Sequence, residues 1–370
     1  MEPFYIGSLK VKLPIVQGGM GVGVSLSGLA SAVANEGGIG IISAVGIGMT
    51  ELDYRINFRR ANKIALRKEI KKARAKTNGI IGVNIMIAAS DFEDLLRIAV
   101  DEQVDVVTMG AGLPLSLPPS FLEQKITKLI PKVSSGRAAN LICKTWRRKF
   151  GRLPDAFVVE GPKSGGHQGF KRIDLFSPEI NLGSIVKETM QVLKPCEQKM
   201  GIEIPVIAGG GIYTGKDMYE IMQAGARAVK MGTRFVTTTE CDVSEAFKQN
   251  YLNCKKDDIV IIDSPVGLPA RTIVNDFVRE IQQGKQKPVK CPWKCLKTCD
   301  NKKVQFCIAE ALFNAAKGNF SKGFSFAGEK AYLADRIMSV KESIAQIKAE
   351  YFQDEMNFQL VNTLTTQKSA

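Results

Sequence analysis

The sequence of 370 residues has a single histidine, His167, so chemistry that needs a side chain titrating near neutral pH has one imidazole candidate. His167 lies in the run SGGHQG, residues 164–169, whose glycines leave the backbone bare for contact with a flat or phosphorylated ligand. The apolar run Asp155–Val159 before it predicts a buried strand. His167 is therefore a candidate catalytic residue, because alternating β/α folds carry their active sites just past the carboxyl ends of strands.

Long apolar runs are also missing, which argues against a membrane-spanning protein. The most apolar early stretch, Ile39–Met49, is too short and too rich in glycine to cross a bilayer. The first residues, Met1–Pro3, include an acid where a secretory signal carries basic residues. The eight cysteines are unevenly spread, so we interpret them as reduced thiols. These features predict a cytoplasmic protein with no membrane partner.

Acidic residues are outnumbered, because 37 Asp and Glu stand against 51 Lys and Arg, a net charge of +14. Much of the excess lies on helical segments such as 67–74, where basic residues mix with acidic and apolar ones as on a solvated helix face. No ribbon of aromatic and basic residues offers a stacking surface for bases, so no nucleic-acid partner is expected. The charge instead favours an anionic small molecule or an acidic carrier protein.

Short apolar runs alternate with longer amphipathic ones up to about residue 240. The apolar runs predict eight strands of a parallel sheet covered on both faces: Leu13–Gln17, Gly38–Ser43, Ile80–Met86, Val104–Met109, Leu129–Ser134, Asp155–Val159, Ile204–Ala208 and Ala228–Met231. Between them, helices are predicted at Leu26–Asn35, Phe58–Lys76, Asp91–Glu102, Gly136–Phe150, Leu182–Met200 and Gly215–Ala224. Eight strands close an α/β (β/α)8 TIM barrel, with a doubly wound open sheet as the alternative.

The regular alternation of predicted strands and helices ends after residue 240. Residues 250–290 are expected to be irregular apart from a helix at Thr272–Gln283, with further helices at Cys307–Lys317 and Val340–Gln353. We expect a barrel over residues 1–240, a C-terminal extension packed on it over 241–361, and a flexible tail over 362–370. A homo-oligomer is compatible with this organisation.

Two glycine turns follow the last two predicted strands. Gly209–Gly211 opens after one strand, and Gly232–Thr233 follows Met231 at the end of the next. Successive glycines let backbone N–H groups converge on an anion, and phosphate sites are common at this place in barrels. The alternative is that these glycines only satisfy the geometry of tight turns. Thr214 and Asp217 are candidate caps of the helix that follows the first turn.

The segment Pro14–Gly23 follows the first strand and is also rich in glycine. It resembles a dinucleotide fingerprint only loosely, because Gly38–Ala44 lacks the acidic residue expected after the second strand. A shelf of backbone amides against a planar ring is the better interpretation. Asn84, at the end of the third strand, can donate and accept hydrogen bonds to such a ring, or it can cap the next turn.

Together, residues 14–23, 82–84, 160–169, 208–212 and 231–235 resemble the flavin-binding loops of the nitronate monooxygenase family, formerly called 2-nitropropane dioxygenases. The related flavin-dependent enoyl-acyl-carrier-protein reductases share this barrel and these loops. The resemblance covers roughly residues 1–240, and Ser264–Ala270 and Gly323–Ser339 are also similar to bacterial members. The chain departs from the commonest pattern at Pro162–Ser164, where Lys163 replaces a residue that is often acidic.

The resemblance implies FMN, bound without a covalent link at the carboxyl mouth of the barrel, with His167 facing its reactive side. It implies that Gly210, Gly211, Gly232 and Thr233 meet the phosphate. The full set of cofactor-binding residues expected on this basis is Gln17, Gly18, Gly19, Met20, Asn84, Glu160, Gly165, Gly166, Gly210, Gly211, Met231, Gly232 and Thr233. His167 would act as a base on a neutral nitroalkane, or as a cation beside an anionic nitronate.

Three functions remain open. The first is an FMN-dependent oxidoreductase that converts alkyl nitronates and oxygen to carbonyl compounds and nitrite. The second is an enoyl-thioester reductase using NAD(P)H, for which the basic surface would suit an acyl carrier protein. The third is a non-catalytic barrel that binds phosphate or flavin.

Four cysteines gather near the C-terminal end, at Cys291, Cys295, Cys299 and Cys307. Their spacing differs from familiar zinc patterns, and Pro292 disfavours the helix that would align them. No metal site is therefore expected, although an iron–sulfur role is not excluded by the residues alone.

Overall fold

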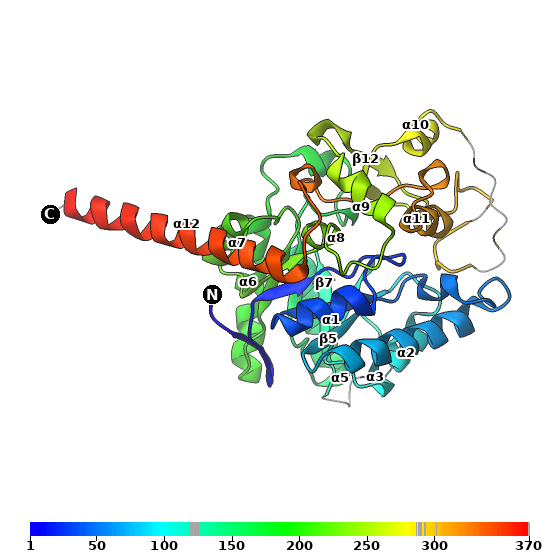
Figure 1. Cartoon of the computed structure of the whole chain (residues 1–370). Coiled ribbons are helices and arrows are strands. Elements are labelled where there is room, and N and C mark those ends of the chain that lie inside the picture. The colour runs from blue at the N-terminus through cyan, green and yellow to red at the C-terminus, as the bar shows by residue number, and fades with distance from the viewer. Residues whose placement is uncertain are drawn as a thin grey trace.

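The computed structural model describes residues 1–118, 121, 126–285, 287, 291, 294–300 and 302–368, with side chains described as far as residue 360. Eight parallel strands close into a barrel, with helices around it (Figure 1). The strands are β3 (Ile15–Gln17), β4 (Ile39–Ser43), β5 (Ile80–Met86), β6 (Val106–Gly110), β7 (Lys128–Val133), β8 (Phe157–Glu160), β10 (Val206–Gly209) and β11 (Ala228–Met231). The predicted (β/α)8 barrel is thus confirmed, because each predicted strand overlaps one of these and the sheet is closed.

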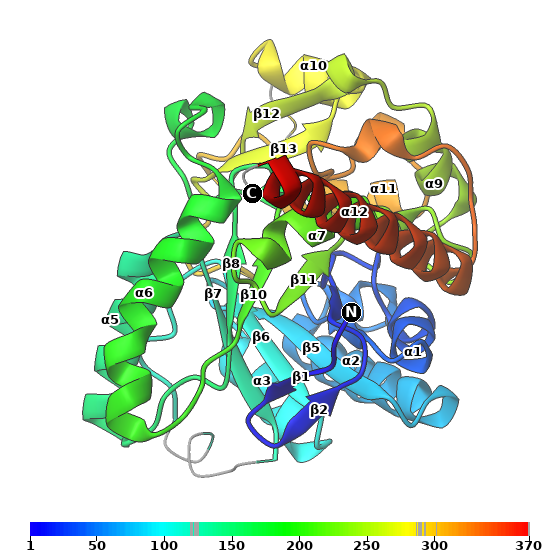
Figure 2. The same cartoon turned by 90° about the vertical axis from the view of Figure 1, so that its left-hand side faces the viewer.

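Pairing between the last strand and the first closes the sheet. Val229 of β11 lies opposite Ile15 of β3, and Met231 lies opposite Gln17. The barrel interior is filled by aliphatic side chains from alternate positions, including Val16, Ile41 and Val158. A short hairpin of β1 (Phe4–Ile6) and β2 (Leu9–Val11) packs its buried side chains on this interior and closes the lower end of the barrel in Figure 2.

The barrel helices bury one face against the outside of the sheet. They are α1 (Ser27–Asn35), α2 (Phe58–Lys76), α3 (Phe92–Asp101), α5 (Gly136–Phe150), α6 (Leu182–Met200), α7 (Gly215–Gln223) and the short α8 (Thr233–Val236), and the six helices predicted from the sequence are confirmed to within two residues. Their ends follow from local chemistry. For example, Ser135 caps α5 by accepting a hydrogen bond from the Ala138 N–H, and Gly151 ends it in a left-handed conformation.

The C-terminal part forms a cap over the carboxyl end of the barrel, above α1 and α2 in Figure 1. It contains α9 (Glu245–Leu252), β12 (Ile259–Asp263), β13 (Pro269–Ile273), α10 (Asp276–Gln282), α11 (Ile308–Ala316) and α12 (Val340–Lys368). Short 3-10 turns are η1 (Ile47–Thr50), η2 (Ile173–Phe176), η3 (Lys256–Asp258), η4 (Phe320–Lys322) and η5 (Ala331–Leu333). The strand β9 (Gly166–His167) belongs to a barrel loop, yet it pairs with β13, with Ala270 opposite His167.

The sequence prediction was wrong for part of this cap. Residues 250–290 are not irregular, because β12 and β13 form an antiparallel pair within them. The helix expected at Thr272–Gln283 begins only at Asp276, and Thr272 lies in β13. The polar residues Arg271 and Thr272 interrupt the apolar run that would have indicated a strand, and they are buried through contacts with the barrel loops and the cap that the sequence alone does not show.

The helices expected at Cys307–Lys317 and Val340–Gln353 are confirmed as α11 and α12, and α12 continues to Lys368. Its first part packs on α7, and its far end projects from the body in Figure 1. The tail expected at 362–370 therefore begins inside α12, and residues 369–370 lie outside the described residues. No helix in the described part of the chain is both long and apolar enough to cross a membrane.

Because β4 packs closely on α1, replacing glycine by alanine is expected to affect stability very differently at two positions. A Cβ on Gly40 would lie 1.8 Å from the Ala30 carbonyl oxygen, whereas a Cβ on Gly183 in α6 would meet nothing closer than 3.5 Å. We expect Gly40→Ala to destabilise the fold by about 3 kcal/mol through overpacking. Gly183→Ala should be neutral or stabilising by about 0.5 kcal/mol, since alanine favours a helix. Equal thermal unfolding midpoints for the two variants would contradict this packing.

Candidate active site

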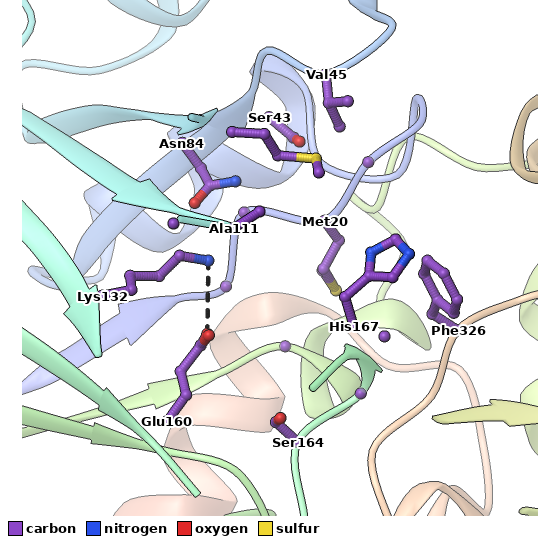
Figure 3. Close-up of a pocket in the computed structure, with 18 of the residues that line it drawn as sticks. Met20, Ser43, Val45, Asn84, Ala111, Lys132, Glu160, Ser164, His167 and Phe326 are labelled. Atoms are coloured by element: carbon purple, nitrogen blue, oxygen red, sulfur yellow. Dashed lines mark ion pairs between the residues drawn. The ribbon is translucent and has the colours of Figure 1, made fainter. Parts of the chain in front are cut away.

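A cavity of about 500 Å3 opens at the carboxyl end of the barrel, between the strand ends and the cap. Figure 3 shows residues from both sides of it, with His167 and Phe326 facing Met20 and the Lys132–Glu160 ion pair. Of the residues predicted to bind the cofactor, the cavity is lined by Gly18, Gly19, Met20, Asn84, Glu160, Gly165, Gly166, Gly210, Gly211, Gly232 and Thr233, and His167 lines it too. The structure thus gathers one site from segments more than 200 residues apart.

Two predicted residues, Gln17 and Met231, do not line the cavity. The Gln17 side chain is fully buried, where its Oε1 accepts a hydrogen bond from the Ile41 N–H at 2.8 Å and its Nε2 donates to the Gly18 carbonyl. The Met231 carbonyl accepts a hydrogen bond from the Gly18 N–H at 2.7 Å. Both residues therefore hold the seam between β11, β3 and β4 behind the cavity surface.

The glycine turns after β10 and β11 form a cradle of unpaired amides. Within the described part of the chain, the N–H groups of Gly210, Gly211, Gly232 and Thr233 have no hydrogen-bonding partner. Gly210 and Gly211 have φ values of 102° and 84°, and a Cβ on Gly210 would lie 2.8 Å from the Gly161 carbonyl oxygen. Glycine is needed here for both conformation and space. Such a set of converging amides suits an anion such as a phosphate.

The first turn of α7 is satisfied within the protein rather than by a ligand, since the Gly215 N–H donates to Glu350 and a capping box holds the rest. Thr214 Oγ1 accepts a hydrogen bond from the Asp217 N–H, and the Asp217 carboxylate accepts one from the Thr214 N–H. Both residues named as candidate caps thus share this role. The amides that remain for a ligand are those of the glycine turns.

Asn84 presents a polar edge to the cavity. Its Oδ1 accepts a hydrogen bond from Thr108 Oγ1 at 2.9 Å, so the side chain is fixed by β6 and does not cap a turn. Because its Oδ1 is held by Thr108, the amide NH2 group of Asn84 is left to donate hydrogen bonds to a ligand in the cavity. Next to it, Ser43 has a fully buried hydroxyl without a partner among the described residues. Sequence reasoning missed Ser43, although it ends the predicted second strand.

A buried charge cluster lies beside this edge. Glu160 is 2.7 Å from Lys230 Nζ and 3.6 Å from Lys132 Nζ. Burial alone would raise the pKa of Glu160, but the charges of Lys132 and Lys230 and hydrogen bonds from both lower it to about 2. Burial, together with the charge of Lys230, lowers the pKa of Lys132 to about 8. The cluster therefore carries a net positive charge near neutral pH.

Lys132 and Lys230 were missed in the sequence, although a signal was present. Each is a lysine inside an otherwise apolar strand run, and such a residue is buried only where a partner or a ligand compensates its charge. Lys163 behaves differently, because its side chain is 55% exposed and pairs with Glu329 at 3.0 Å at the cavity rim. It is a solvated lysine, paired at the surface, and not part of the charge cluster inside the cavity.

His167 is held by contacts to its ring and to its loop. Its Nε2 lies 2.7 Å from Ser264 Oγ, and its ring meets Phe326 edge-on with centroids 5.1 Å apart. The buried Arg271 donates hydrogen bonds to the carbonyls of Pro162 and Ser164 and so fixes the loop that carries the histidine. Ser264, Arg271 and Phe326 come from the cap, and their roles were not identified from the sequence.

The electrostatic environment keeps His167 neutral. Burial, together with the positive charge of Lys132, lowers its pKa to about 4. A cationic imidazole beside an anionic substrate, one of the two roles considered for His167, is therefore not supported near neutral pH. The neutral ring can donate or accept one hydrogen bond through its remaining nitrogen.

The four cysteines near the C-terminal end are free and partly buried, and Cys295 lines the cavity. Burial and the neighbouring thiols raise the pKa of Cys295 to about 12, so it is not a reactive thiolate. Among the described residues, no three His, Cys, Asp or Glu side chains are placed to hold a metal ion.

The pKa of His167 can be measured directly, because the protein has no other imidazole. We expect the proton NMR signal of its ring to titrate well below pH 6.5. Lys132→Met should raise the pKa by removing a positive charge, yet leave it below 6.5 because burial, the larger cause, remains. Lys163→Met at the exposed rim serves as the control and should change nothing. A wild-type midpoint at or above 6.5 would contradict this electrostatic description.

Comparison with known proteins identifies the family to which the chain belongs. A match to the family described as nitronate monooxygenase spans residues 2–350. The probable nitronate monooxygenase of Staphylococcus saprophyticus is 28% identical over 300 residues, covering 75% of this chain and 80% of the relative. A Mycobacterium tuberculosis protein named as a hydroxy-methyl-oxo-octahydroindene-carboxyl-CoA dehydrogenase is 28% identical over 274 residues, 74% of this chain. That match spans 66% of the relative, slightly less than two thirds of its length.

Solved structures show the same architecture. FabK from Thermotoga maritima superposes with a TM-score of 0.73 at 30% identity, covering 94% of this chain and 96% of FabK. Nitroalkane oxidase from Streptomyces ansochromogenes has a TM-score of 0.70 at 22% identity, which supports the fold alone. The family match, the barrel and the lined cavity lead to one conclusion: the chain belongs to the nitronate monooxygenase family of flavin-dependent oxidoreductases.

Proposed function

We propose that the protein is an FMN-dependent enzyme that oxidises alkyl nitronates with oxygen to carbonyl compounds and nitrite. The observation that carries this proposal is the placement of the neutral His167 and the cationic Lys132 around one cavity that also holds the glycine cradle. A buried positive charge suits an anionic substrate, and the imidazole supplies a polar contact to it. The resemblance to curated nitronate monooxygenases supports the substrate class.

The residues of the cavity fit FMN. The amides of Gly210, Gly211, Gly232 and Thr233 would hold the phosphate, and Asn84, Ser43 and Lys132 offer polar contacts for the edge of a flavin ring. The site lacks the acidic residue of a dinucleotide fingerprint, which favours a mononucleotide. Bound FMN would supply an electron acceptor for the substrate that can pass its electrons on to oxygen.

The protein's own contribution is to position the substrate and exclude water. The cap covers the cavity, and Val22, Val45 and Phe326 add apolar walls to it. Lys132 stabilises negative charge on the bound substrate, and its pKa of about 8 means that this charge is lost as the pH rises through that value. In the same cavity, His167 stays uncharged at all pH values well above about 4.

A pair of substitutions at Gly232 tests the phosphate cradle. A Cβ at Gly232 would meet only the flexible Met20 side chain, at 3.3 Å, and the φ value there is −105°, so variants should fold. We expect Gly232→Asp to reduce FMN affinity far more than Gly232→Ala, because both add a Cβ but only aspartate adds a negative charge beside the phosphate. Bound FMN is measured from the visible spectrum after gel filtration. Equal and normal flavin content in both variants would show that the phosphate does not bind at this cradle.

The reaction is tested by nitrite release from propyl nitronate in air. We expect His167→Ala to keep its FMN while kcat/KM falls by about 10- to 100-fold, the value of one hydrogen bond to a charged substrate. For the wild type, kcat/KM should stay level between about pH 6 and 8 and fall above about pH 8 as Lys132 loses its charge. Lys132→Met should lack that alkaline decline. A wild type that releases no nitrite would refute the proposed reaction.

A second candidate is reduction of an enoyl thioester with NAD(P)H. It is favoured by the 30% identity to FabK over 94% of the chain, and FabK is an enoyl-acyl-carrier-protein reductase. Leu268, Leu296 and Leu312 of the cap line the cavity and would suit an acyl chain, and the net charge of +14 would suit an acidic carrier protein. Under nitrogen, rapid bleaching of the flavin by NADH or NADPH without nitrite release from nitronate in air would favour this candidate.

A further inference from the structure

Ser264 is fixed next to His167 by a tight turn of the cap. It follows β12, and its N–H donates to the Leu268 carbonyl at 3.1 Å while its own carbonyl accepts from the Gly267 N–H at 2.8 Å. The residue is only 7% exposed. The turn of the β12–β13 connection and the burial of Ser264 therefore restrain the position of its hydroxyl.

The hydrogen bonds around this hydroxyl determine which way its proton points. Ser264 Oγ accepts a hydrogen bond from the Val266 N–H at 3.4 Å and lies 2.7 Å from His167 Nε2. A serine hydroxyl has one proton to donate, and leaving a buried proton without an acceptor costs about 1–3 kcal/mol. Among the described residues, Nε2 of the uncharged imidazole is the acceptor within hydrogen-bonding distance. This arrangement favours a hydroxyl that donates to Nε2 over one that accepts from it.

A neutral imidazole whose Nε2 accepts a hydrogen bond carries its proton on Nδ1. Nδ1 of His167 has no partner among the described residues, and the ring lines the cavity beside Phe326 (Figure 3). We propose that Ser264 is a positioning residue that fixes His167 in its Nδ1–H tautomer, so that the ring offers the cavity a hydrogen-bond donor and not a base.

This tautomer selects a class of substrate. The inference about the substrate rests on the proposed function. A nitroalkane must lose a proton to a base before it can be oxidised, whereas a nitronate is already an anion. An Nδ1–H group together with the Lys132 ammonium group would bind the oxygens of a preformed nitronate. The site is therefore specific for the nitronate over its parent nitroalkane.

The single histidine makes the tautomer directly observable. The holoenzyme, produced without a histidine tag and with ¹⁵N-labelled histidine, should show one protonated and one unprotonated ring nitrogen near pH 7 in long-range proton–nitrogen spectra. We expect the proton on Nδ1. A proton on Nε2 in the wild type would overturn the proposal without any substitution, and this measurement does not depend on which substrate the enzyme uses.

Substitution of Ser264 tests the cause. Ser264→Ala removes the donor, so the proton should redistribute toward Nε2, and the ratio of kcat/KM for propyl nitronate over that for nitropropane should fall about tenfold, the value of one hydrogen bond. Ser264→Thr keeps a hydroxyl and should restore both the tautomer and the ratio. An unchanged tautomer in Ser264→Ala would overturn the positioning role, and an altered tautomer with an unchanged ratio would overturn the substrate assignment. Absence of nitrite from the wild type would refute only the proposed reaction.

Discussion

The hydrogen bond from the Gly18 N–H to the Met231 carbonyl, 2.7 Å long, marks the closure of the barrel on which the site depends. It joins the first barrel strand to the last and so places the glycine-rich segment after β3 against the glycine turn after β11. The approach is close, since a Cβ on Gly18 would lie 3.0 Å from the Gly232 Cα. An open sheet with the same strands would leave these two segments at opposite edges, with no cavity between them.

Closure also explains the charges of the site. Side chains at the carboxyl ends of β7, β8 and β11 converge on the axis, which brings Lys132, Glu160 and Lys230 into one buried cluster. The surplus charge is positive, and all three side chains line the cavity, so the cluster presents a net positive charge to it. Its effect on His167 is to add to burial and to keep the ring neutral. The pKa of the single imidazole is thus lowered mainly by burial and in part by Lys132 across the cavity (Figure 3).

Much of this architecture is predictable from the sequence, for a physical reason. Strands of a covered parallel sheet are apolar on both faces, so runs such as Ile39–Ser43 stand out from the amphipathic helices between them. The glycine turns were also recognisable, because few other residues tolerate the backbone conformation at Gly210 and Gly211. The cap was harder. β13 carries Arg271 and Thr272, whose burial depends on partners distant in sequence, and Ser264 acquires its role only when β12 and β13 fold back over the histidine.

The pairing of β9 with β13 makes the cap and the loop that carries His167 parts of one backbone sheet. Because Arg271 donates hydrogen bonds to the carbonyls of Pro162 and Ser164, the cap also holds the loop that carries the imidazole. Exchanging the cap or the histidine loop alone would therefore break the short sheet that they share, so the two segments can change only as one unit.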